Sequence, residues 1–280
     1  MLKIHSRRPY LFAGALLTAV FCLCGSIVAQ EKNGRTEKKR DFCAGNNYSY
    51  NNKVSYKESR ELTMNAVSLL TVDGQRNGSI HVRGENRSDV LILACVQTTG
   101  DTEQEAEKMA KNIRIETGST IRAENAPDEP VWGVSYEIIV PRLTNLKLTA
   151  HNGGIVIDSV EGTINFETLN GGIIVSDAAG DVRGRTTNGG VNVKLSGGSW
   201  KGAGLDVETR NGGVHLTMAG NYAARIETGT VNGGFRSDIA ALDVDRGERN
   251  RAVRLNTDLN GGGALVRVVT TNGGVRINSN

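Results

Sequence analysis

Few side chains in this sequence of 280 residues have the type and spacing that metal binding or catalysis requires. Beyond the N-terminal segment the histidines are His81, His151 and His215, and the last two lie far from any cluster of cysteines, histidines or carboxylates. A zinc site or a nucleophile–base pair needs several such groups close together. We therefore predict no metal ion, no cofactor and no catalytic residue.

Two functional classes of repetitive β proteins, calcium-binding β-rolls and polysaccharide-degrading β-helix enzymes, have recognisable charged residues, and the sequence fits neither class well. Calcium-binding β-rolls need an aspartate that recurs at one offset, whereas Asp158 and Asp177 do not recur in this way. Polysaccharide-degrading β-helix enzymes need clustered carboxylates or a basic residue acting as a base on one face. The strands here show asparagine, threonine and scattered single charges instead, so a non-enzymatic protein is the favoured interpretation.

The cysteines outside the N-terminal segment are a candidate disulfide pair. Two of the four lie in the N-terminal segment, and the remaining pair is Cys43 and Cys95. We predict a disulfide between them, because such a pair is readily oxidised outside the cytoplasm. Two unrelated thiols are the alternative. A zinc site is disfavoured, since no histidines lie nearby to complete the ligand set.

Residues 1–29 are typical of an export signal. Lys3, Arg7 and Arg8 form a basic start, Leu11 to Cys24 is apolar, and Ala29 is a plausible cleavage point. The segment also resembles a twin-arginine signal, and an uncleaved anchor is a further alternative. We expect the protein to be exported, to the periplasm, to the outer surface or into the medium. No membrane span is expected after removal of the signal.

The net charge of +3 belongs to this signal. The segment carries three of the 33 basic residues and none of the 30 acidic ones, which leaves 30 of each in the mature chain. A nucleic-acid partner would require a basic face. The sequence therefore predicts no nucleic-acid partner.

A repeated triplet organises the second half of the chain. The triplet is Asn-Gly-Gly, and it begins at Asn152, Asn170, Asn188, Asn211, Asn232, Asn260 and Asn272. Asparagine and glycine tolerate positive φ and favour turns. Most triplets precede an alternating apolar run, such as Ile155 and Ile157, which is the signal of a strand. Five triplets have a threonine two positions earlier, namely Thr168, Thr186, Thr209, Thr230 and Thr270.

The spacing of these triplets predicts an all-β fold, a single-stranded β-helix (β-solenoid) with coils of about 18 residues. Each coil would lie one strand spacing, about 4.8 Å, from the next, and the seven asparagines would form a ladder at one corner. Antiparallel hairpins with Asn-Gly turns are the main structural alternative. In the β-solenoid Asn152, Asn170 and Asn188 would be neighbours, whereas in antiparallel hairpins they would not.

The regions before the repeats are less regular. Residues 30–56 are a polar lead-in, and residues 57–150 form a β region with a helix near 102–113. Thr102 and Glu105 have the spacing of a capping box at the start of that helix. From about residue 131 the chain is expected to enter the stacked coils, and residues 151–280 are the regular repeats. We expect residues 57–280 to form one continuous domain.

The pattern in residues 57–280 resembles the bacterial "putative adhesin" family, a domain of unknown function on exported proteins. The matching features are the irregular β start, Ile138-Ile139-Val140-Pro141 followed by Leu146-Lys147-Leu148, and the serial Asn-Gly-Gly strands. The resemblance implies a β-helix at the cell envelope or surface. It supplies no catalytic residues.

The later repeats are longer, and their extra residues indicate where binding would occur. The insertions fall within residues 195–204, 218–224 and 237–251, in the turn opposite the asparagines. Repeat proteins often bind partners at the edge where insertions accumulate. We predict that Trp200, Lys201 and Tyr222 contact an unidentified protein or glycan of the envelope; loops with no binding role are the alternative.

The sequence is therefore compatible with two functions from different classes. One is an exported, adhesin-like surface protein that acts as an interaction or structural module without enzymatic activity. The other is a carbohydrate-binding or polysaccharide-degrading β-helix protein. Scarce aromatic residues and the missing acidic cluster favour the first.

Overall fold

A computed structural model describes residues 42–44, 53–118, 120–128, 131–244 and 252–280 of the protein. The predicted signal and most of the lead-in lie outside these residues. The first strands are β1 (Val54–Asn65), β2 (Leu69–Asp73), β3 (Ile80–Glu85), β4 (Asp89–Gly100), β5 (Arg114–Thr117), β6 (Thr120–Glu124), β7 (Trp132–Pro141) and β8 (Asn145–Ala150). The repeats supply β9 (Ile155–Asp158), β10 (Glu161–Asn170), β11 (Ile173–Ser176), β12 (Ala179–Asn188), β13 (Val191–Lys194), β14 (Gly204–Asn211), β15 (Val214–Met218), β16 (Ala224–Asn232), β17 (Phe235–Ser237), β18 (Val253–Leu259), β19 (Leu265–Asn272) and β20 (Val275–Ser279). The helices are α1 (Glu103–Asn112) and the short 3-10 helix η1 (Ala240–Leu242).

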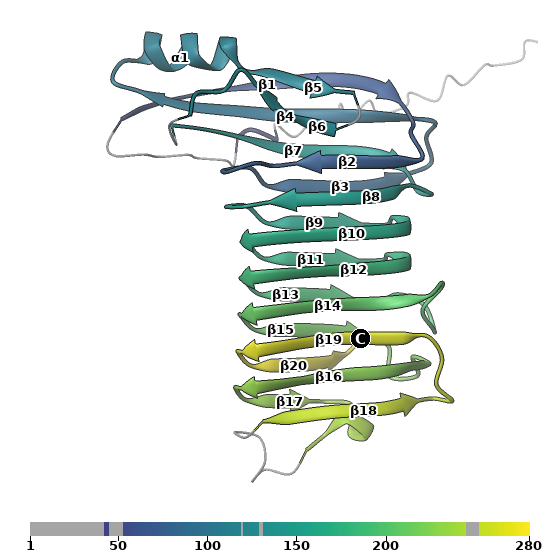
Figure 1. Ribbon diagram of the computed structural model, residues 1–280. Helices are drawn as coiled ribbons and strands as arrows, with labels where there is room; N and C mark the ends of the chain where they lie inside the picture. Colours follow the sequence, from purple (N-terminus) through teal and green to yellow (C-terminus); the bar gives the residue numbers. More distant parts are fainter. Residues whose placement is uncertain (1–41, 45–52, 119, 129–130, 245–251) are drawn as a thin grey trace, which may run out of the picture. The chain divides into compact units, whose positions relative to one another are not determined.

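The strands form two ten-stranded sheets that face each other (Figure 1). Sheet A has the order β1-β4-β7-β3-β9-β11-β13-β15-β20-β17, and sheet B has the order β18-β16-β19-β14-β12-β10-β8-β2-β6-β5. The repeat strands pair in parallel, with Ile164 opposite Val182 and Ile173 opposite Val191, a shift of 18 residues. An all-β fold is therefore confirmed, and the hairpin alternative is wrong for these repeats.

Alternation along each strand places one set of apolar side chains between the sheets. In sheet A, Ile155, Ile173 and Val191 stack in one buried column, and in sheet B Ile164 and Val182 do the same. Burial of each such side chain stabilises the fold by about 1.5–3 kcal/mol. No repeat could bury this surface alone, because its apolar residues are covered by the repeats on either side.

The order of the coils departs from the order of the sequence. The final pair of strands, β19 and β20, lies between the pair β14–β15 and the pair β16–β17. Each strand of this final pair forms parallel pairings on both sides. The expectation of a simple sequential stack is therefore wrong at this end, where β18 pairs antiparallel with β16.

Parallel stacking begins earlier than residue 131. Strands β2 and β3 pair in parallel with β8 and β9, so residues 69–85 already form a coil of the same stack. Strand β7 then pairs in parallel with β3 and antiparallel with β4. The long strand β1 pairs antiparallel with β4 and forms the edge of sheet A.

The predicted helix and disulfide are both present in this first region. Thr102 and Glu105 form the capping box, and α1 buries Ala106 and Ala110 against strands β1 and β4. Cys43 and Cys95 are joined by a disulfide, which confirms the predicted pairing and connects the lead-in to β4.

Candidate functional site

The asparagine ladder runs along one edge of the stack. The side-chain amide of Asn170 donates to Oδ1 of Asn152 at 2.8 Å, and Asn188 donates to Asn170 at 2.8 Å. The same bond connects the following pairs, at 2.8–2.9 Å: Asn211 to Asn188, Asn272 to Asn211, and Asn232 to Asn272. Asn77 is not the first residue of an Asn-Gly-Gly triplet, but its Oδ1 accepts a hydrogen bond from the side-chain amide of Asn152 and so extends the ladder.

Asn260 does not belong to the ladder, and its inclusion in the prediction is wrong. Its φ is 48°, and its side chain donates to the carbonyl oxygens of Gly220 and Tyr222. Gly261, Gly262 and Gly263 also have positive φ, from 79° to 145°. These four residues reverse the chain between the antiparallel strand β18 and strand β19, so this triplet serves a different turn.

The threonines before the triplets tie each coil to its neighbour. Thr168 donates its hydroxyl to the carbonyl of Gly153 at 2.7 Å, and Thr186 donates to Gly171 at 2.8 Å. Thr209, Thr270 and Thr230 donate in the same way to the first glycine of the adjacent triplet. All five threonines are buried, and each donates its hydroxyl proton to the scaffold.

The predicted aromatic contact at Trp200 and Tyr222 is wrong, because both side chains are buried. Trp200 is 8% exposed and donates its indole N–H to the carbonyl of Gly180, and Tyr222 is 1% exposed. Burial raises the pKa of Tyr222 to about 12. Ser199 and Ala223 pair in a parallel bridge, so the two insertions pack on one another, and Trp200 and Tyr222 belong to the hydrophobic core. Lys201 alone of the three is exposed.

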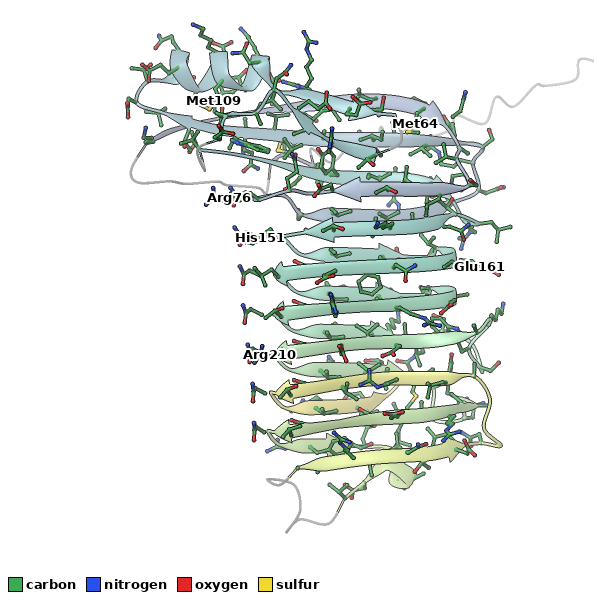
Figure 2. All side chains as sticks on the ribbon, in the orientation of Figure 1. Met64, Arg76, Met109, His151, Glu161 and Arg210 are labelled. Atoms are coloured by element: carbon green, nitrogen blue, oxygen red, sulfur yellow. A yellow bond between two sulfur atoms is a disulfide. The ribbon has the colours of Figure 1, made fainter. Side chains whose placement is uncertain are left out.

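The histidines are dispersed, as Figure 2 shows for His151 at the edge of the stack. Burial lowers the pKa of His81. The Nε2 atom of His215 is buried without a hydrogen-bond partner among the described residues. In the part of the chain that the structure describes, no group of three or more histidines, cysteines or carboxylates could hold a metal ion.

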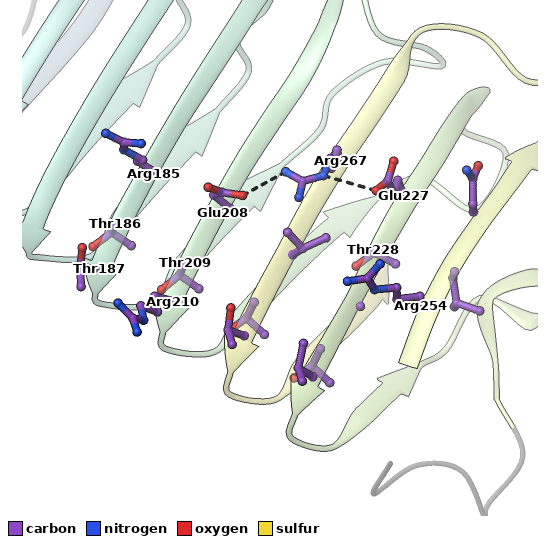
Figure 3. Close-up of a pocket in the computed structure, with 18 of the residues that line it drawn as sticks. Arg185, Thr186, Thr187, Glu208, Thr209, Arg210, Glu227, Thr228, Arg254 and Arg267 are labelled. Carbon is purple, nitrogen blue, oxygen red and sulfur yellow. Dashed lines mark hydrogen bonds and ion pairs between the residues drawn. The ribbon is translucent and has the colours of Figure 1, made fainter. Parts of the chain in front are cut away.

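A groove of about 800 Å³ on the outer face of sheet B is the strongest candidate site (Figure 3). Strand register explains why it forms. One outward row, read from β8 to β18, contains Lys147, Asn165, Arg183, Asp206, Arg267, Glu227 and Asn256. The next contains Thr149, Glu167, Arg185, Glu208, Val269, Gly229 and Arg254. Short residues at Val269 and Gly229 interrupt the long charged side chains and leave a hollow.

Ion pairs fix most of the charges around this hollow. Arg267 Nη1 lies 2.6 Å from Asp206 Oδ1 and 3.2 Å from Glu208 Oε2, and its Nε lies 3.4 Å from Glu227 Oε1. Burial opposes the charge of Arg267, but hydrogen bonds with Asp206 and Glu208 outweigh it and raise the pKa. Farther along the second row, Arg185 pairs with Glu167 at 2.9 Å, and this bond raises the pKa of Arg185.

The hollowed face continues beyond the groove. A second hollow of about 400 Å³ is lined by residues of β8, β10, β12 and β14, and it shares Glu167, Arg185 and Glu208 with the first. Together they cross seven neighbouring strands, from β18 to β8. Such a surface fits an extended ligand lying across the strands better than a compact one.

Sequence reasoning missed this face. Each charged residue occupies an outward position of a predicted strand, which was the available signal. The sequence did not reveal which strands are neighbours in sheet B. The groove residues Glu208, Glu227, Arg254 and Arg267 come from four strands spread over 60 residues.

Comparisons with known proteins find distant likenesses in structure only. No protein-family model and no curated protein matches the chain. A putative cell adhesion protein from Clostridium sporogenes has 12% identity and a TM-score of 0.44, with 80% of this chain and 100% of that chain covered. A putative adhesin from Bacteroides fragilis has 11% identity and a TM-score of 0.29, with 80% and 97% covered.

A putative lipid binding protein from Parabacteroides distasonis has 10% identity and a TM-score of 0.26, with 79% of this chain and 96% of that chain covered. Likenesses this weak assign no function. Among the described residues, no helix is long and apolar enough to span a bilayer.

Proposed function

We propose that this protein is an exported, non-enzymatic interaction module of the cell envelope or surface, in which a β-solenoid scaffold holds an extended ligand across the outer face of sheet B. The observation that carries this proposal is the groove at Val269 and Gly229, with its continuation toward β8. The Cys43–Cys95 disulfide supports an oxidising compartment. The periplasm, the outer surface and the medium all meet that condition.

The charges of the groove favour binding over hydrolysis. A glycosidase needs one carboxyl group that keeps its proton and a second that is free to act as nucleophile or base. Glu208 and Glu227 instead both pair with Arg267, so neither carboxylate stands free of a protein partner. A polysaccharide-degrading enzyme is therefore the less favoured alternative.

The proposal can be tested with a matched pair of variants. Val269→Phe fills the floor of the groove, whereas Ile174→Phe makes the same kind of change at an exposed position of β11, in sheet A. On arrays of glycans and envelope proteins, the wild type and Ile174→Phe should bind a common ligand, and Val269→Phe should lose it. A reducing-end assay on any bound glycan should show no cleavage.

Three results would overturn the proposal. One is the absence of binding on any array, and another is equal loss of binding in the two variants. The third is the release of new reducing ends by the wild type, which would establish the enzymatic alternative.

A further inference from the structure

Two arginines at the groove are not used by the ion pairs described above. Arg210 on β14 and Arg254 on β18 both line the groove (Figure 3). Neither forms a side-chain hydrogen bond or an ion pair with a described residue, whereas Arg185 and Arg267 each do. The groove therefore holds two guanidinium groups whose donors face no protein acceptor in the described chain.

The two arginines stand on opposite sides of the hollow. Strands β19 and β16 lie between β14 and β18, so the strands that carry Arg210 and Arg254 are three strand spacings apart, roughly 14 Å at about 4.8 Å each. Arg254 is in register with Glu208, and Arg210 lies two residues farther along β14, so the two arginines face each other diagonally across the hollow. The floor between them is formed by Val269 and Gly229. A ligand that contacts both arginines must span this floor.

Guanidinium groups bind planar carboxylates through two parallel hydrogen bonds. Between Arg210 and Arg254 the rim also carries the carboxylates Glu208 and Glu227. These would repel a ligand with a negative charge on every unit. A polymer whose carboxylates are separated by neutral units avoids that repulsion.

The remaining surface favours a sugar polymer over a peptide. The hydroxyls of Thr187 and Thr271 line the groove and have no side-chain hydrogen bond within the described chain. A peptide partner would bind chiefly through large side chains inserted into apolar pockets. The apolar side chains that line the groove are Val231, Leu255 and Val269, and no aromatic side chain is among its described lining residues. The other side chains of the lining are polar or charged, which favours hydrogen bonding to a sugar chain.

We propose that the groove binds an acidic polysaccharide in which uronate carboxylates alternate with neutral sugars, and that Arg210 and Arg254 each bind one carboxylate. This inference rests on the proposed function of the same face. It adds the ligand class and the two residues that recognise it.

Hyaluronan fragments are a suitable probe, because their carboxylates lie on alternate sugars. Binding should be measured by calorimetry for the wild type, Arg210→Gln and Arg254→Gln, with Arg236→Gln as the control. Arg236 is an exposed arginine of β17 in sheet A, and its substitution removes the same charge. We expect each groove variant to weaken binding at least fivefold and the control to remain within twofold. Melting temperatures should be unchanged in all three.

Chemically modified ligands separate this inference from the proposed function. Hyaluronan methyl esters keep the sugar chain but lose the charge, and they should bind at least tenfold more weakly. If the esters bind equally well and Val269→Phe abolishes binding, the carboxylate inference is wrong while the groove remains a binding site. Failure to bind hyaluronan, tighter binding of poly-glutamate, or an equal effect of Arg236→Gln would each overturn the inference. If no array ligand binds either, the proposed function fails with it.

Discussion

The first glycine of each triplet in the asparagine ladder is required by close packing, and not by the positive φ that the sequence predicts. Among the triplets of the ladder only Gly273, with a φ of 159°, departs from negative φ, and it lies close to the extended region. A Cβ atom on Gly171 would lie 2.1 Å from the carbonyl oxygen of Gly153, and on Gly189 it would lie 2.1 Å from that of Gly171. Backbones of successive coils thus approach too closely for any side chain.

This explanation predicts the effect of adding one methyl group. Gly171→Ala should lower the free energy of unfolding by about 3 kcal/mol, because the clashing atom is backbone and cannot rotate away. Gly198→Ala is the control, since no atom lies within 4 Å of its Cβ position. Urea denaturation of the two variants measures the difference. Similar stabilities would show that the coils separate easily at this corner.

At the scale of the element, a hydroxyl and an amide join each coil to the next one. The threonine hydroxyl reaches the first glycine of the neighbouring triplet, and the asparagine amide reaches the neighbouring asparagine. The threonine is buried, since Thr186 is 3% exposed, whereas Asn188 is exposed. Thr187, the next residue along the strand, lines the groove. The buried bond should therefore carry more of the stability.

Removing that hydroxyl without changing the side-chain shape tests this view. Thr186→Val should cost about 1–2 kcal/mol of unfolding free energy, because the Gly171 carbonyl loses its donor. Thr187→Val, one residue farther along the same strand, should remain within about 0.5 kcal/mol. Thermal denaturation of both variants provides the measurement. An equal loss would mean that valine is poorly accommodated in this strand for reasons unrelated to the hydrogen bond.

At the scale of the whole molecule, the last segment of the chain lies inside the stack. Strands β19 and β20 have partners on both sides, whereas β17 and β18 are the edge strands of sheets A and B at this end. A chain that folded in sequence order would leave its last strands at the edge. Here the final coil must enter between two coils formed by earlier residues.

Hydrogen exchange of the intact protein should reveal this arrangement. Amides of Leu265–Asn272 and Val275–Ser279 should exchange more slowly than those of Phe235–Ser237 and Val253–Leu259, because interior strands open only when their neighbours do. Mass spectrometry of peptides from these segments gives the comparison. Faster exchange in the C-terminal segment would indicate that it can leave while the rest of the stack stays closed.

The sequence alone determined the features that depend on local pattern. The 18-residue spacing and the alternation after each triplet predicted strands that pair one repeat apart, as Ile164 and Val182 do. The capping box at Thr102 predicted the helix, and two cysteines in a chain expected to be exported predicted their bridge. The insertion predicted within residues 195–204 does precede β14, where Leu205 is in register with Val182 and Ile164, because strand alternation fixes which residues point inward.

Only the tertiary structure decided the features that depend on which segments become neighbours. Strands of similar repeats present similar backbone edges to a pairing partner, so nothing in the local sequence indicates that β19 lies between β14 and β16. The burial of Trp200 and Tyr222 in the core accompanies the packing of their two insertions on each other. The groove likewise depends on lateral order, since Gly229 and Val269 form a hollow only when their strands are adjacent. Parallel neighbours are specified by the packing of whole coils, and that information is spread over the entire chain.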